Sequence, residues 1–298
     1  MIPPQLVLGF SDYSNQAKQL ANALDIDYIE INLHRFPDGE SKIQIPELLP
    51  PHVIVCRSLN TPNNKLIELL LVNRTCKLHG CENITLVCPY LCYMRQDIAF
   101  NPGEAISQQI IGQFLASMID NIITVDPHLH RIDRLEQAIP VKHAIALSAA
   151  PLIGEFLAQK FDSALLVGPD IESQQWVSVA AQNSHFEYII AKKIRNGDSE
   201  VEVTLPDFSN TCEVAIIVDD IASTGHTLIH TAKALKKHAF KHIHCMVTHA
   251  LLSADALVLL QNAGIEHIWS TDSISHWSNK LTLTPLIANS INSLISKP

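Results

Sequence analysis

The sequence predicts an α/β protein with two similar domains, each a mostly parallel sheet flanked by helices. Three observations support this fold class. Short apolar runs alternate with segments of helical periodicity along the whole chain, as in stacked βα units. The scheme occurs twice, in halves of roughly 140 residues. The 298 residues also suffice for two domains of about 150 residues each.

In the first half, apolar runs too short for helices predict strands at Leu6–Leu8, Tyr28–Leu33, Val53–Cys56, Ile84–Cys88 and Ile122–Val125. Helical spacing of apolar residues predicts helices at Asn15–Leu24, Asn63–His79 and Ile106–Met118. Gly80 directly follows the second helix, in a position where glycine commonly ends one.

The second half repeats this order. Its predicted strands are Ala164–Val167, Tyr188–Ala191, Val214–Val218, His242–Thr248 and Glu266–Ser270. Its predicted helices are Pro151–Gln159, Glu172–Ala181, Thr227–His238 and Ser253–Asn262. We expect the N-terminal domain at 1–145 and the C-terminal domain at 146–284, with a final helix over about 285–298 that packs on the first domain.

The composition narrows the class of protein. Apolar residues make up 47% of the chain and charged residues 17%, which is typical of a globular protein. The net charge of -9 argues against nucleic acid or an anionic membrane as a partner. Seven cysteines without CxxC spacing indicate a reducing compartment and no zinc site. With no signal-peptide pattern and no long apolar run, we expect a cytoplasmic protein.

The most informative stretch runs from Val214 to Leu228. A buried parallel strand is expected to deliver Asp219 and Asp220 to the edge of the sheet where α/β proteins bind ligands. The loop Ser223–Thr227 then opens a helix whose free N–H groups suit a phosphate. The paired carboxylates suit two neighbouring hydroxyl groups. The stretch therefore fits a ribose 5-phosphate, although an Asp pair can also merely end a strand and begin a turn.

This stretch resembles the phosphoribosyl-diphosphate (PRPP) binding loop of the type I phosphoribosyltransferase-like fold. The chain departs from that loop at His226, where the pattern usually has a second glycine. The resemblance implies that ribose 5-phosphate is bound by Asp219, Asp220, Ser223, Thr224, Gly225, His226 and Thr227.

Two stretches of the first half also follow predicted strands. Arg35–Glu40 contains the Pro and Gly of an exposed turn, together with an aromatic ring and two acids. Pro89–Asp97 ends in Arg-Gln-Asp, in which Arg can pair with phosphate and Gln can contact a base. Taken alone, the first stretch is better explained by an ordinary surface turn, and the second is equally well explained by a loop held by an Arg–Asp pair.

Together, the two stretches resemble the ATP site of the ribose-phosphate diphosphokinase, or PRPP synthetase, family. The turn matches its Phe-x-Asp-Gly-Glu pattern, and the loop matches its Pro-Tyr-x-x-Tyr-x-Arg-Gln-Asp pattern, although Ile98 replaces the basic residue that usually follows. The resemblance implies an ATP site formed by Phe36, Asp38, Glu40, Arg95, Gln96 and Asp97.

The resemblance also implies Mg²⁺ as the cofactor. His128 matches the histidine of the family's Asp-Leu-His motif, and Asp170 matches its second magnesium-site acid. A single histidine is more often structural than metal-binding, and His130 could replace or assist His128. Glu172 and Ser173 stand where the family has two glycines after this acid.

Lys192, Lys193 and Arg195 precede the dipeptide Asn196-Gly197. Such a cluster of basic residues before Asn-Gly is typical of a solvated hairpin tip. In the family, this position holds a mobile catalytic loop with a Lys-x-Arg pattern, which Lys193 and Arg195 reproduce. The resemblance therefore implies that these two residues are catalytic.

As a whole, the resemblance implies a transferase that moves the diphosphoryl group of ATP to C1 of ribose 5-phosphate, for nucleotide biosynthesis. It further implies a homo-oligomer built from dimers, with hexamers common in the family. Two alternatives stay open: a phosphoribosyltransferase that consumes PRPP, which would not need the ATP motifs, and a non-catalytic regulatory homologue, which would lose the catalytic or metal residues.

Overall fold

The computed structural model describes residues 2–196, 200–208, 212–238 and 240–296, with side chains omitted for 193–202. The chain divides into two compact units. One comprises Met1–Leu147, Ser273–Ser275 and Leu283–Pro298, and the other comprises Ser148–Asp272 and His276–Thr282. Within the described residues, no helix combines the length and the apolar character needed to cross a membrane.

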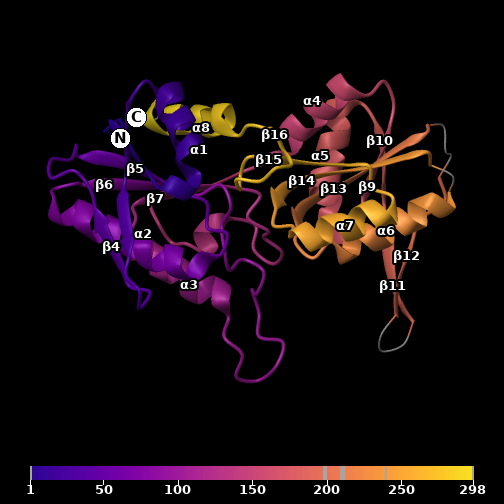
Figure 1. Ribbon diagram of the computed structural model, residues 1–298, viewed down its shortest axis with the longest axis horizontal. Coiled ribbons are helices and arrows are strands. Elements are labelled where there is room, and N and C mark those ends of the chain that lie inside the picture. Colours follow the sequence, from indigo (N-terminus) through magenta and orange to yellow (C-terminus); the bar gives the residue numbers. More distant parts are fainter. Residues whose placement is uncertain (1, 197–199, 209–211, 239, 297–298) are drawn as a thin grey trace. The chain divides into compact units, whose positions relative to one another are not determined.

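The first unit contains a parallel six-stranded sheet in the order β2-β1-β5-β6-β7-β8. These strands are β1 (Leu6–Gly9), β2 (Asp27–Glu30), β5 (His52–Cys56), β6 (Asn83–Val87), β7 (Asn121–Val125) and β8 (His143–Leu147). Helices α1 (Ser14–Leu24) and α8 (Thr284–Ser296) cover one face, and α2 (Pro62–Leu78) and α3 (Ser107–Ala116) cover the other (Figure 1). Both faces are covered, so every residue of β5 is buried, which explains the continuous apolar run Val53–Cys56 within it.

A hairpin leaves this sheet after β2. The sequence predicts one strand over Tyr28–Leu33, but the chain turns away at Ile31, and β3 (Asn32–Arg35) pairs antiparallel with β4 (Ser41–Gln44). Ile31 is buried, and its N–H donates to Gly9 O at 2.8 Å, the last bond of this segment to β1. The predicted strand is therefore divided between two sheets.

The second unit repeats the order of the first as β10-β9-β13-β14-β15-β16, again all parallel. Its strands are β9 (Leu165–Gly168), β10 (Glu187–Ile190), β13 (Val214–Ala222), β14 (His242–Ala250), β15 (His267–Thr271) and β16 (Asn279–Leu281). Helices α4 (Ala150–Lys160) and α5 (Gln174–Ser184) lie on one face, and α6 (His226–Lys237) and α7 (Ala254–Ala263) lie on the other (Figure 1). The predicted fold class is confirmed.

Further short elements complete the second unit. Strands β11 (Lys192–Asn196) and β12 (Glu200–Thr204) form an antiparallel pair, and a 3₁₀ helix spans Ile171–Ser173. The edge strands β8 and β16 were not predicted from the sequence. Each has at least one polar residue and lacks the continuous apolar run of a central strand, because an edge strand is less enclosed.

Candidate functional site

The Asp pair lies inside a strand rather than after it. The sequence predicts a strand that ends at Val218, but β13 continues to Ala222, because Asp219, Ile221 and Ala222 stay in register with β14. The loop that follows is consequently only Ser223–Gly225. The carboxylates and the helix start still meet at the carboxyl end of a central strand, the edge where ligands bind in this class of sheet.

Gly225 provides the turn from β13 into α6. Its φ of 77° lies in the left-handed region, and a Cβ on it would lie 3.3 Å from Leu260 of α7. His226 is the first residue of α6, and its side chain is exposed. A side chain at position 226 therefore meets no backbone restriction, which explains how the chain accommodates His where the family pattern has glycine.

Three carboxylates crowd this edge of the second unit. Burial raises the pKa of Asp219 well above its ordinary value, and the negative charges of Asp220 and Asp170 raise it further. Asp220 itself is buried, with 3% of its surface exposed. Carboxylate oxygens are the ligands that Mg²⁺ prefers, and a bound divalent cation would relieve their mutual repulsion. The donor chemistry therefore fits Mg²⁺.

Asp170 follows β9, the neighbour of β13, and begins the 3₁₀ helix Ile171–Ser173. Its Oδ1 accepts from Ser173 N at 3.3 Å, while Ser173 Oγ donates to Asp170 O at 2.6 Å. Ser173 is fully buried and supplies these bonds at a position where the family pattern has glycine. The glycine that this turn requires is Gly168, where a Cβ would lie 2.5 Å from Ser173 Oγ.

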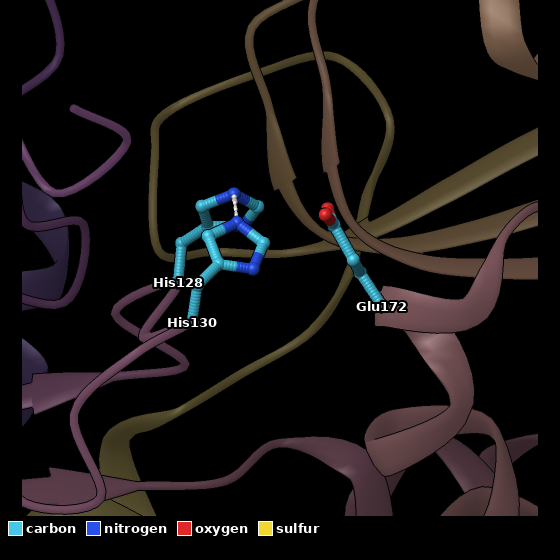
Figure 2. A group of neighbouring side chains, drawn as sticks. All are labelled: His128, His130 and Glu172. Atoms are coloured by element: carbon cyan, nitrogen blue, oxygen red, sulfur yellow. Dashed lines mark hydrogen bonds between the residues drawn. The ribbon is translucent and has the colours of Figure 1, made fainter. Parts of the chain in front are cut away.

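The two histidines of the first unit form a pair. Their Nε2 atoms are 2.6 Å apart, and the rings meet edge to face (Figure 2). The backbone supports this arrangement with positive φ values at Asp126 (40°) and His128 (50°). Glu172, also drawn in Figure 2, belongs to the second unit and lies in its 3₁₀ helix. Imidazole nitrogen suits a hard cation less well than carboxylate oxygen.

The Phe-x-Asp-Gly-Glu turn forms the tip of the β3–β4 hairpin. Phe36 N donates to Glu40 O at 2.8 Å, and Gly39 N donates to Phe36 O at 2.9 Å, with Gly39 at a φ of 94°. The side chains of Phe36, Asp38 and Glu40 are exposed, and the Phe36 ring contacts His34 edge to face. The turn therefore presents an aromatic ring and two acids to solvent.

The residues of the Arg-Gln-Asp segment have different surroundings. Arg95 is exposed, Gln96 is half-buried, and Asp97 is buried. Asp97 accepts a hydrogen bond from Arg131 Nη1 at 2.6 Å, so the loop is held by an Arg–Asp pair whose arginine lies outside the loop. Burial also raises the pKa of the Cys92 thiol in the same loop to about 12, so this cysteine is protonated and is not a nucleophile.

Lys193 and Arg195 lie on β11, where they oppose Val203 and Val201 of β12. The hairpin expected from the Asn-Gly dipeptide is present, although its tip at 197–199 and the two side chains lie outside the described residues.

A buried charge cluster in the first unit escaped the sequence analysis. Arg57, only 1% exposed, pairs with the fully buried Glu68 and with Asp12, whose other oxygen contacts Lys65. Burial by itself would raise the pKa of Asp12, but Arg57 and Lys65 outweigh it and hold that pKa below its ordinary value. A signal was available, because Glu68 is the one acid in the apolar run from Leu66 to Val72.

Comparisons with known proteins cover nearly the whole chain. Residues 6–118 match the family model of the N-terminal domain of ribose phosphate pyrophosphokinase. Residues 204–297 match that of the phosphoribosyl synthetase-associated domain. A ribose-phosphate pyrophosphokinase from Methanopyrus kandleri is 29% identical, with 97% of this chain and 99% of the relative covered. Ribose-phosphate pyrophosphokinase 2 from Archaeoglobus fulgidus is 32% identical, with 92% and 96% covered.

The fold has a counterpart among solved structures. Phosphoribosylpyrophosphate synthetase from Mycobacterium smegmatis superimposes with a TM-score of 0.83, over 98% of this chain and 99% of that one. The sequences are 22% identical, so this likeness concerns the fold.

Proposed function

The chain belongs to the ribose-phosphate pyrophosphokinase (PRPP synthetase) family, and we propose that it transfers the diphosphoryl group of ATP to the C1 hydroxyl of ribose 5-phosphate. The products are PRPP and AMP, and the pathway served is nucleotide biosynthesis. The observation that carries this proposal is the edge of the second unit, where two acids of β13 are followed by Gly225 and the start of α6. Carboxylates that can accept hydrogen bonds from two neighbouring ribose hydroxyls therefore lie beside backbone N–H groups that can bind a phosphate.

In this proposal, ribose 5-phosphate binds at the β13–α6 edge. The N–H groups of the loop and of the first turn of α6 hold the 5-phosphate, because the helix dipole favours an anion there. Asp219 and Asp220 accept hydrogen bonds from the ribose hydroxyls and orient C1. The full set of proposed ligands is Asp219, Asp220, Ser223, Thr224, Gly225, His226 and Thr227.

ATP is proposed to bind through the first unit. The exposed ring of Phe36 offers a stacking surface for the base, while Arg95 and Gln96 supply donors. Asp38 and Glu40 are proposed to contact the nucleotide from the same turn. Asp97 is also included in the proposed ATP site, although its carboxylate already forms an ion pair with Arg131.

The reaction requires alignment and charge neutralisation rather than covalent catalysis. The oxygen of the C1 hydroxyl attacks the β-phosphorus and its proton is released to solvent. The bond from that phosphorus to the α,β-bridging oxygen breaks, and AMP leaves. Lys193 and Arg195 are proposed to stabilise the charge that spreads over the transferred group. Asp170, which lies among the crowded carboxylates, and His128 are proposed to hold Mg²⁺, with His130 able to assist. The cation would supply positive charge that offsets the charge of the phosphate groups.

We also propose that the protein acts in the cytoplasm as a homo-oligomer built from dimers. Six of the seven cysteines are buried and all are free thiols, in keeping with a reducing compartment. The exposed Phe36 and Phe100, 42% and 66% accessible, offer apolar surface that a second copy could cover.

The decisive experiment measures AMP formation from ATP by the purified protein. The proposal requires that AMP appear only when both ribose 5-phosphate and Mg²⁺ are present. A phosphoribosyltransferase would instead consume PRPP with a base, and a regulatory homologue would leave ATP unchanged. Either outcome with folded protein would overturn the proposal.

A further inference from the structure

Glu68 is a buried carboxylate that the proposed reaction does not use. It lies in α2, and none of its side-chain surface is exposed. Burying a charge costs free energy unless the charge is paired, so the partners of Glu68 show which segments of the fold it connects. Those partners come from two different parts of the first unit.

One carboxylate oxygen is held by Arg57, which directly follows β5 of the six-stranded sheet. Glu68 Oε2 lies 2.6 Å from Nη1 of Arg57, which is itself only 1% exposed. Arg57 is in turn held by Asp12 at 3.1 Å and by the ring of Phe10, 3.8 Å from its guanidinium carbon. Glu68 is therefore anchored to a rigid, buried cation.

The other oxygen reaches the hairpin that carries the proposed ATP-binding turn. Glu68 Oε1 accepts from Arg35 Nε at 2.9 Å and from Ser41 Oγ at 3.1 Å. Arg35 and Ser41 face each other across β3 and β4, as the last pair before the turn 36–40. A single carboxylate thus holds both strands at the base of the turn.

The hairpin depends on such contacts for its orientation. Among the described strands, β3 and β4 pair only with each other, so no ladder of backbone hydrogen bonds ties them to the six-stranded sheet. Leu33 and Ile43 pack against the core, but apolar packing does not fix direction as a charge-assisted hydrogen bond does.

We propose that Glu68 is a positioning residue for ATP, which acts through Arg35 and Ser41 to hold the turn Phe36–Glu40 in place. This inference rests on the proposed function, because it takes that turn to contact the nucleotide. The alternative is that Glu68 forms an ion pair that only stabilises the fold. The two explanations differ in whether a looser hairpin lowers the affinity for ATP while kcat stays unchanged.

The test substitutes a residue of the hairpin rather than Glu68. Glu68→Ala would remove a carboxylate partner from the buried Arg57 and could prevent folding. Arg35→Ala leaves Glu68 paired with Arg57, and the Arg35 side chain is already 52% exposed. Lys42→Ala is the matched control, since it removes one positive charge from an exposed position of the same hairpin. Arg35→Lys, which restores a charge with a simpler donor, tests for rescue.

Two readouts are compared across these variants. In Arg35→Ala, we expect hydrogen exchange at the Phe36 and Gly39 amides to accelerate about five- to tenfold, the range for losing one half-exposed charged hydrogen bond. The KM for ATP should rise about tenfold, with kcat and the KM for ribose 5-phosphate within about twofold of wild type. Arg35→Lys should recover part of both effects, and Lys42→Ala should show neither.

The readouts separate this inference from the proposed function. A wild-type protein without activity would refute the proposed function, while hydrogen exchange would still report whether Glu68 holds the hairpin. Unchanged exchange in Arg35→Ala would overturn the inference. So would faster exchange with an unchanged KM for ATP, or an equal rise of that KM in Lys42→Ala.

Discussion

Replacing Gly225 by alanine tests how the β13–α6 turn shapes the proposed phosphate cradle. A φ of 77° costs an L-residue about 1–2 kcal/mol. The new Cβ would also lie 3.3–3.4 Å from three Leu260 side-chain atoms, which adds mild overpacking of up to about 1 kcal/mol. We therefore expect Gly225→Ala to lower the free energy of unfolding by about 2 kcal/mol.

The same substitution should weaken ribose 5-phosphate binding. Relief of the strain rotates the N–H groups at the start of α6, and one misplaced hydrogen bond to a charged phosphate is worth about 1.5–3 kcal/mol. The KM for ribose 5-phosphate should then rise at least about tenfold, while the KM for ATP changes little.

Gly225→Asn separates the two causes. Asparagine tolerates the left-handed region better than alanine but carries the same Cβ. If the backbone angle dominates, denaturant titrations should show Asn less destabilising than Ala. Equal losses would assign the effect to Leu260. An Ala variant with unchanged stability and unchanged KM for ribose 5-phosphate would refute the reasoning.

Three further predictions concern single side chains. Lys193→Ala should lower kcat by orders of magnitude with modest changes in substrate binding, and steady-state kinetics that place the whole loss in KM would contradict its transition-state role. His226→Gly should preserve or improve ribose 5-phosphate affinity if His226 is only tolerated, whereas a marked loss in a binding titration would mean that it donates to the phosphate. Burial lowers the pKa of His244 from 6.5 to about 4 in the folded protein. As the pH falls, this histidine therefore binds a proton in the unfolded protein before it does so in the folded one. The free energy of unfolding should decrease by up to about 3 kcal/mol as pH drops from about 6.5 to 4. His244→Phe should flatten that dependence in unfolding titrations, whereas His185→Asn at an exposed position should leave it in place. An unchanged slope in His244→Phe would be inconsistent with this cause.

The sequence predicts the central strands and the helices because a strand that is buried on both faces has a continuous apolar run, as at Val53–Cys56 of β5. The prediction is wrong where one predicted strand is divided between two sheets, as at Ile31. It is also wrong where strand pairing extends over polar residues, as at Asp219 and Asp220 of β13. Register with a neighbouring strand is a tertiary property, and the composition of a single run does not contain it.

For the candidate site, the sequence identifies residue types better than their partners. The pattern of Pro89–Asp97 suggests an Arg–Asp pair, but the arginine is Arg131, from a loop after β7. Likewise, Glu68 stands out as an acid in an apolar helix, although only the structure shows that it contacts Arg35. The roles proposed for the binding and catalytic residues stay predictions until the variants are measured.

The central claim is that the C1 hydroxyl of ribose 5-phosphate attacks the β-phosphorus of ATP. It is tested most directly with ATP that carries ¹⁸O in the α,β-bridging oxygen, followed by mass spectrometry of both products. Attack at the β-phosphorus breaks its bond to that oxygen, so the label should appear in AMP and be absent from PRPP. Label in PRPP, or ADP in place of AMP, would contradict the account.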